Sequence, residues 1–361
     1  MNMEKKIFIC FLFAALLITA GCRKDDTPAE VKTPVGFRAR SQTAVVKADA
    51  NDNNDPLSNY HQDFGVWGIA TEAINHPYVL WKDSTFEKVE QVGNSINYAP
   101  VTDAYWLTGY SYNFLALAPY ENGVNNLTIN KNLATDNQSA NPSISFTYDM
   151  SGKYNPTVQG QTPNYTYDLL GAAASHKVKR NEIPVSQDLV FWHLFSRIKI
   201  RVNFDGSTGS VQAIRLHNVD QDIAYSISPS SDVQTPAVAC TNTSKTTTVN
   251  PISFTTSSSN YYDEDKDGEK EWYLSIVPQN ISDFKMFLDF TTKIDGNDVV
   301  VRDYEIDLSP AKDKPDYTYN NQYNWNITIG PKQAITFNVT VTPWTTVGPD
   351  DDGGIPEIEI K

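Results

Sequence analysis

Residues 198–204, IKIRVNF, decide the fold class of this chain. Apolar side chains occupy every second position, at Ile198, Ile200, Val202 and Phe204. Successive side chains of an extended strand point to opposite faces, so this pattern places one apolar face against a core. An α-helix repeats every 3.6 residues and cannot bury a face with period two. The stretch therefore predicts a half-buried β-strand.

The same alternation recurs through the second half of the chain, at residues 272–276, 284–290, 304–308, 323–329 and 335–341. Clusters of turn-forming residues separate these runs. The first half has aromatic and apolar runs of similar length. Short strands joined by polar turns are typical of β-sandwiches. We therefore expect an all-β protein with two antiparallel sandwiches in series.

The basic, polar residues 175–184 are the expected connection between the two sandwiches. The expected segments are a signal peptide at 1–21, a flexible tether at 22–34, a first sandwich at 35–182 and a second at 183–361. Within the first sandwich, residues 98–119 are expected to form an aromatic hairpin that turns at Thr108-Gly109.

The N-terminal residues have the features of an export signal. Lys5 and Lys6 precede an apolar run that ends at small residues. The run is too short to span a membrane. Ala20-Gly21-Cys22 resembles the lipobox of bacterial lipoproteins, in which the cysteine is acylated, and charged residues 23–26 resemble a signal for export to the outer surface. We expect a surface-exposed lipoprotein of the outer membrane, anchored through Cys22. The alternative is an ordinary cleaved signal with an incidental cysteine.

Charge and cysteine content restrict the possible partners. The chain has 361 residues and a formal net charge of −14. An acidic surface repels phosphate backbones, so no nucleic-acid partner is expected. Cys10 would leave with the signal and Cys22 would be acylated. Cys240 would then have no disulfide partner, and we expect a small buried residue there.

No catalytic residue, metal site or cofactor is expected. Residues 263–268, DEDKDG, match the start of a calcium-binding loop, but its twelfth position is Leu274 instead of a glutamate. A solvated hairpin tip is therefore preferred over a calcium site. His193 lies near Ser196 and Asp188 in the sequence, yet no nucleophile elbow accompanies them. We expect His193 to be a structural histidine.

Five stretches, taken in order, resemble the fimbrillin-like family of Bacteroidetes, the FimA- and Mfa-type pilin and pilus-accessory lipoproteins. They are FGVWG at 64–68, YNFLALAP at 112–119, DLLGA at 168–172, LVFWHLFSRI at 189–198 and VTVTPW at 339–344. The resemblance implies two tandem transthyretin-like β-sandwiches, in agreement with the alternation. It also implies a structural or adhesive pilus component without enzymatic activity.

The resemblance further implies a way of assembly. A trypsin-like maturation protease would remove the leading strand by cutting after Arg38, Arg40 or Lys47. A C-terminal strand of another pilus subunit, the same or different, would then fill the opened groove. In this chain the candidate donor residues are Ile335, Phe337, Val339, Val341, Ile355, Ile358 and Ile360.

Three alternatives stay open at this point. The basic residues near the leading strand could guard a solvated edge strand, and the C-terminal tail could be a frayed polar terminus. A surface lipoprotein that does not polymerise could instead bind glycans by stacking sugars on exposed aromatic side chains, at Trp81, Tyr105, Trp106, Tyr261 and Tyr262. A hydrolase is disfavoured because no acid, base or nucleophile constellation is recognisable.

Overall fold

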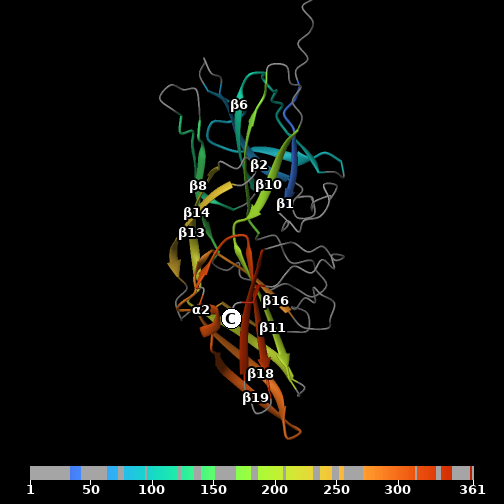
Figure 1. Cartoon of the computed structure of the whole chain (residues 1–361), viewed down its shortest axis with the longest axis vertical. Helices are drawn as coiled ribbons and strands as arrows, with labels where there is room; N and C mark the ends of the chain where they lie inside the picture. Colours follow the sequence, from blue (N-terminus) through green and yellow to red (C-terminus); the bar gives the residue numbers. More distant parts are fainter. Residues whose placement is uncertain are drawn as a thin grey trace, which may run out of the picture.

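The computed structural model in Figure 1 is almost entirely β-sheet. It describes residues 33–41, 63–71, 77–93, 96–120, 123–133, 140–150, 168–179, 186–205, 209–230, 236–245, 252–255, 271–313, 315–330, 335–343 and 358–359. Within these ranges the only helix is the short α2 (Ser309–Lys312). None of the described residues forms a helix with the length and apolar character needed to cross a membrane. The all-β fold class is confirmed.

The N-terminal part is built around a sheet that closes on itself. Its order is β3 (Tyr78–Val79), β2 (Asp63–Thr71), β4 (Glu87–Gln91), β5 (Asn97–Pro100), β1 (Phe37–Ser41), β10 (Gln187–His193), β9 (Leu170–Lys177) and β6 (Ser111–Ala118). β2 pairs with β6 as well as with β4, so the ring from β2 round to β6 is complete. A closed sheet encloses its own core and has no open edge within the ring.

Strands β2 and β6 carry continuous apolar runs because both of their faces are buried. Phe64 and Phe114 point into the barrel core, while Trp67 and Leu115 point outward to a second core. A smaller sheet covers that second core, with the order β14 (Pro236–Lys245), β13 (Asp220–Pro229), β8 (Ser143–Asp149) and β7 (Asn125–Asn130). Burial on two faces explains why the sequence of β2 does not alternate.

The C-terminal part is a sandwich of two sheets. One has the order β16 (Glu271–Ile276), β11 (Ser196–Phe204), β21 (Asn321–Ile329), β22 (Ile335–Pro343) and β23 (Ile358–Glu359). The other has the order β15 (Ile252–Thr255), β12 (Gly209–His217), β18 (Lys285–Ile294) and β19 (Asn297–Ile306). A small pair, β17 (Gln279–Asn280) and β20 (Asp316–Tyr317), lies beside them. Ile198 and Ile200 are fully buried between the sheets, so the strand predicted from IKIRVNF is confirmed.

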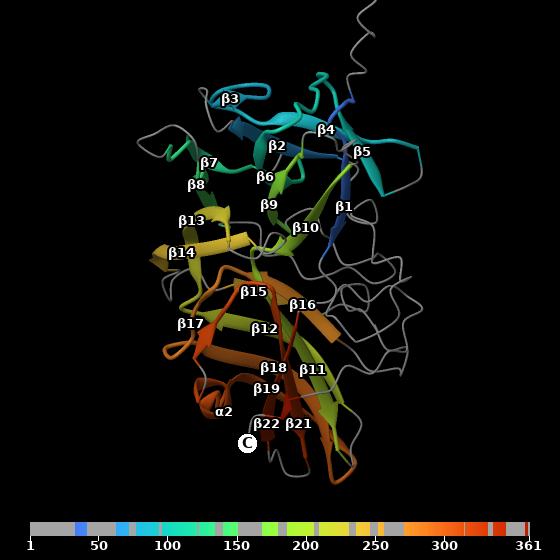
Figure 2. The same ribbon diagram turned by 45° about the horizontal axis from the view of Figure 1, so that its top comes forward.

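The sheets do not follow the boundary expected at residues 182 and 183. β10 belongs to the N-terminal barrel, and β13 and β14 pair with β8 (Figure 2). The sheets are also not purely antiparallel, because β1 runs parallel to β10 and β11 runs parallel to β21. A polar connection in sequence marks a loop, but strand pairing across it decides which core a strand joins.

Two local expectations are wrong. Residues 98–119 do not form a hairpin, because β5 pairs with β4 and β1 whereas β6 pairs with β2 and β9. Cys240 is exposed rather than buried. It lies on β14, an edge strand, where one face of the strand has no core to cover it.

Candidate functional site

The leading strand β1 is an integral part of the barrel. It runs parallel to β10 through five residue pairs, from Phe37 with Gln187 to Ser41 with Phe191. On its other side it pairs antiparallel with β5 at Phe37 and Arg38. β1 therefore has a neighbouring strand on each side over its first residues (Figure 2).

The inward side chains of this ribbon, residues 33–41, fill the barrel core. Val35, Phe37 and Ala39 alternate with more exposed residues and are 2%, 0% and 0% exposed. The Phe37 ring centroid lies 5.3 Å from that of Phe114, 6.0 Å from that of Phe64 and 6.3 Å from that of Trp81. Aromatic pairs at such distances stabilise a core beyond the burial of area alone. Phe37 is thus the main apolar anchor of the ribbon.

Backbone hydrogen bonds continue on both edges of the ribbon. The donor and acceptor pairs are Val35 N to Ala104 O (2.8 Å), Ala39 N to Ile96 O (3.0 Å), Trp106 N to Thr33 O (2.9 Å) and Gln187 N to Gly36 O (2.8 Å). Removing the ribbon would leave these groups of the surrounding strands without partners inside an apolar groove. Such unpaired edges are strong templates for another extended chain.

The outward side of the ribbon carries the basic residues that the sequence singled out. Arg38 forms a two-pronged ion pair with Asp188 on β10, with Nε to Oδ1 at 2.6 Å and Nη2 to Oδ2 at 2.8 Å. Arg40 is half-buried on the same strand, and Lys47 lies outside the described residues. The interpretation of a solvated edge strand is wrong for Arg38, because β1 has partners on both sides there.

The candidate donor residues divide into two groups. Ile335, Phe337, Val339 and Val341 belong to β22, which pairs with β21 along its whole length. Phe337 packs edge-on against Trp325 with ring centroids 5.7 Å apart. β22 is thus a structural strand of the C-terminal sandwich. Ile358 lies in β23, which pairs with β22 at two positions, whereas Ile355 and Ile360 lie outside the described residues.

Of the described aromatic residues considered for glycan binding, Tyr105 is exposed, whereas Trp81 and Trp106 are not. Trp106 is 6% exposed and packs edge-on against Tyr112 at 4.7 Å between ring centroids. Burial raises the pKa of Tyr112 to about 12, so its hydroxyl stays neutral inside the barrel. Trp81 is half-buried against Phe37, and Tyr261 and Tyr262 lie outside the described residues. The alternative hypothesis of a glycan site required an exposed Trp106, and the structure contradicts that condition.

His193 lies in the protein core. It is fully buried, and its Nδ1 lies 2.6 Å from Asp168 Oδ2. Asp188 pairs instead with Arg38, and the Ser196 hydroxyl donates to the Thr318 carbonyl at 2.8 Å. The three residues considered for a triad therefore have separate structural partners. Among the described residues, no group of histidine, cysteine and acidic side chains could hold a metal ion.

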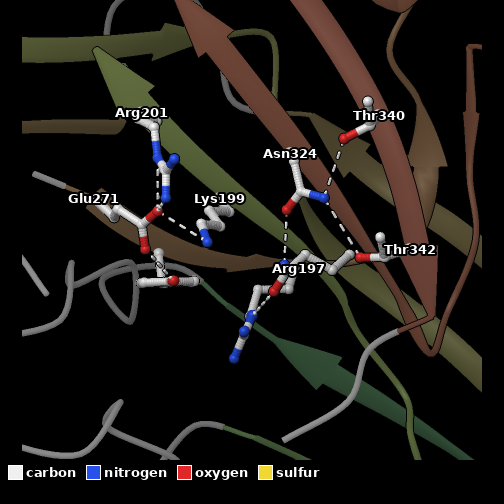
Figure 3. A network of polar contacts seen from close by, with 9 residues as sticks. Arg197, Lys199, Arg201, Glu271, Asn324, Thr340 and Thr342 are labelled. Atoms are coloured by element: carbon white, nitrogen blue, oxygen red, sulfur yellow. Dashed lines mark hydrogen bonds and ion pairs between the residues drawn. The ribbon is translucent and has the colours of Figure 1, made fainter. Parts of the chain in front are cut away.

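A buried polar network on the outer face of β11 and its neighbours was not predicted from sequence (Figure 3). Glu271 is 0% exposed and accepts hydrogen bonds from Arg201 Nε at 2.8 Å and from the Tyr273 hydroxyl at 2.6 Å, and Lys199 Nζ lies 2.9 Å from its Oε1. Arg197 stacks over the Tyr273 ring at 4.5 Å from its centroid. The pattern of IKIRVNF indicated only the apolar face of β11, and the burial of Arg197 and Glu271 on the other face required the structure.

A second part of this network joins the guanidinium of Arg197 to neutral amide and hydroxyl side chains. Arg197 donates to Gln322, which donates to Asn324, and Asn324 in turn contacts the hydroxyls of Thr340 and Thr342. The chain of contacts joins β11, β21 and β22. Buried polar groups need such partners, because leaving one unsatisfied costs about 1–3 kcal/mol.

The chain is an all-β protein in which the ribbon, residues 33–41, completes the barrel core. The chain belongs to the fimbrillin-like family, because the model of that family matches residues 50–344. The resemblance seen in the sequence is confirmed. Membership makes it a cell-surface, pilus-related or adhesion-type protein and points to a non-enzymatic role.

Solved structures that match this chain include proteins of Bacteroides, Porphyromonas and Parabacteroides. A candidate cell adhesion protein of Bacteroides uniformis is 17% identical, with a TM-score of 0.47 over 86% of this chain and 98% of that chain. The tip fimbrial protein Mfa3 of Porphyromonas gingivalis is 10% identical, with a TM-score of 0.39 over 86% and 98%. A fimbrial assembly protein of Parabacteroides distasonis is 9% identical, with a TM-score of 0.37 over 86% and 96%. A search of curated proteins gives no match.

Proposed function

We propose that this chain is a surface-exposed outer-membrane lipoprotein and a structural or adhesive component of a pilus. In this proposal a protease removes the ribbon, and a strand of another subunit takes its place in the barrel. The observation that carries the proposal is the position of β1. It is a complete strand of the first core, yet it lies near the N-terminus, upstream of the residues that match the family.

The way in which β1 pairs with β10 is compatible with replacement of the ribbon by a strand of another chain. No hairpin connects the two strands, and 150 residues separate Arg38 from its partner Asp188. The ribbon is held by side chains in the groove and by backbone hydrogen bonds, both of which another chain can supply.

The pairing of β1 disfavours Arg38 as the cleavage position. A protease binds its substrate as a free extended segment, and the backbone at Arg38 is paired with both β5 and β10. Cleavage there would require the strand to open first. Arg40 lies near the end of β1, where the described pairing with β5 has stopped and the pairing with β10 continues at Val190. We therefore propose cleavage after Arg40 or Lys47.

Uptake of a ribbon peptide tests the proposal. The full chain is treated briefly with trypsin, the trypsin is then inhibited because the probe itself contains Arg38 and Arg40, and the protein is mixed with a fluorescent peptide of residues 33–41, TPVGFRARS. Cleaved protein is expected to take up the peptide as its own ribbon leaves, and uncleaved protein is not. Fluorescence polarisation and native mass spectrometry measure the exchange.

Two controls make this result specific. A protein with Arg38→Gln, Arg40→Gln and Lys47→Gln should keep its ribbon and take up no peptide. A peptide with Phe37→Ala should bind much more weakly, because it lacks the aromatic anchor. If the cleaved core keeps its first strand, or if it takes up no ribbon peptide, strand exchange is not its function.

The lipid anchor has a separate test. Metabolic labelling with palmitate is expected to mark the wild-type chain, and the label should disappear in Cys22→Ala. Cys240→Ala is the matched control, since Cys240 lies on an edge strand of the folded protein and should not affect labelling. Equal labelling of all three proteins would exclude acylation at Cys22.

A further inference from the structure

The groove that the ribbon occupies fits a different kind of side chain at each of three successive positions. The first is the position of Phe37. Its ring has aromatic neighbours at 5.3, 6.0 and 6.3 Å between centroids, and two of them, Phe64 and Phe114, are themselves fully buried. An aliphatic side chain at this position would leave part of the pocket empty, and unfilled cavities weaken packing.

The second position, that of Arg38, lies beside Asp188. The carboxylate receives two hydrogen bonds from Arg38 and loses both when the ribbon leaves. A basic residue in an incoming strand restores them. An acidic residue there would be a like charge directly across the strand pair, which is unfavourable.

The third position, that of Ala39, is fully buried and pairs with Leu189 on β10. A larger side chain would have to displace packed neighbours in the barrel core, and overpacking of this kind is destabilising. The groove therefore fits an aromatic, a basic and a small residue in succession.

The C-terminal tail of this chain does not have this pattern. Residues 345–361, TTVGPDDDGGIPEIEIK, contain no aromatic residue. Ile358 is flanked by Glu357 and Glu359, so placing it in the Phe37 pocket puts a glutamate beside Asp188 in either strand direction. Ile355, between Gly354 and Pro356, avoids this in both directions, and Ile360, followed by Lys361, avoids it in one, but both leave an isoleucine in the aromatic pocket.

Strand β22 is closer to this pattern, but it is already paired within the C-terminal sandwich. Its residues 335–339, ITFNV, place Phe337 between two aliphatic residues, as Val35 and Ala39 flank Phe37. However, β22 is paired with β21 over its whole length, and Phe337 packs against Trp325. Donating β22 would require the C-terminal sandwich to open.

We infer, on the basis of the proposed strand exchange, that the groove accepts a strand from a different protein chain in preference to the tail of a second copy. The occupant is an extended segment with an aromatic residue, then a basic residue, then a small residue. The protein is thus a heterotypic acceptor, and the unpaired carboxylate of Asp188 and the aromatic pocket select its partner.

Peptide competition tests this inference. Full chain that has been cleaved by trypsin and is loaded with labelled ribbon peptide is challenged with three unlabelled peptides. They are the ribbon peptide of residues 33–41, the tail peptide of residues 348–361, and the tail peptide with Ile358→Phe, Glu359→Arg and Ile360→Ala. The tail peptide is expected to compete at least about tenfold more weakly than the ribbon peptide, and the triple change should recover most of the difference.

A charge reversal at Asp188 distinguishes sequence-selective peptide binding from non-selective peptide binding. Asp188→Lys should weaken uptake of the ribbon peptide and strengthen uptake of the unmodified tail peptide. If the tail peptide competes as well as the ribbon peptide, the groove does not discriminate and the inference is wrong, although strand exchange stands. If not even the ribbon peptide is taken up, strand exchange itself fails.

Discussion

Phe37→Ala is expected to lower the free energy of unfolding of the full chain by about 3–5 kcal/mol. Phe37 is fully buried in the barrel core, and its ring packs against three other aromatic rings. The substitution removes this packing and leaves a cavity that rigid aromatic neighbours can fill only in part. Urea denaturation followed by tryptophan fluorescence measures the loss.

Hydrogen exchange on the same variant shows where the loss acts. The amide of Gln187 donates to the carbonyl of Gly36, and the amide of Ala39 donates to that of Ile96. Both amides should exchange faster in Phe37→Ala if the ribbon opens before the rest of the barrel.

Phe287→Ala is the matched control for this prediction. Phe287 lies on β18, is only half-buried and contacts the ring of His217 at 4.9 Å between centroids. The control should cost clearly less stability than Phe37→Ala and leave exchange at Gln187 unchanged. Equal losses for the two variants would show that Phe37 is not the anchor of the ribbon.

Glu271→Gln is expected to destabilise the C-terminal sandwich by about 3 kcal/mol. The Glu271 carboxylate is fully buried and is the shared partner of Lys199 and Arg201. Gln has the same shape but no charge, so it leaves two neighbouring cations without their counterion on a poorly solvated face. Breaking one side of a buried ion pair is costly because the remaining charges keep their desolvation penalty.

Glu305→Gln provides the comparison for an exposed pair. Glu305 lies 3.3 Å from Lys285, and the two side chains are 53% and 50% exposed. Its loss should change stability by about 1 kcal/mol or less. Thermal and urea unfolding of both variants at several salt concentrations measure the difference. A Glu271→Gln protein as stable as the wild type would mean that water reaches this network.

The strands themselves could be predicted from short stretches of sequence. Alternation at residues 198–204 and 323–329 correctly indicated β11 and β21, because side-chain direction in a strand depends only on position along that strand. The fimbrillin-like family was also recognisable from sequence, since its motifs are short stretches of consecutive residues.

The groove was only partly predictable. The sequence pointed to a leading strand with basic residues, but it did not show that Phe37 anchors the strand. It also did not show that Arg38 pairs with Asp188, 150 residues away. For the same reason the hairpin at residues 98–119 was wrong, since neighbouring strands in the chain found other partners in space.

The sequence alone thus determined the all-β class, the strands and the family of this protein, because those properties depend on local periodicity and short motifs. Only the tertiary structure decided that β1 closes the barrel, that β10 joins the barrel core and β13 joins the second core beside it, and that cations of β11 meet the buried carboxylate of Glu271. The physical reason is that strand pairing and burial depend on contacts between residues far apart in the chain. No local pattern specifies which of several similar strands will meet.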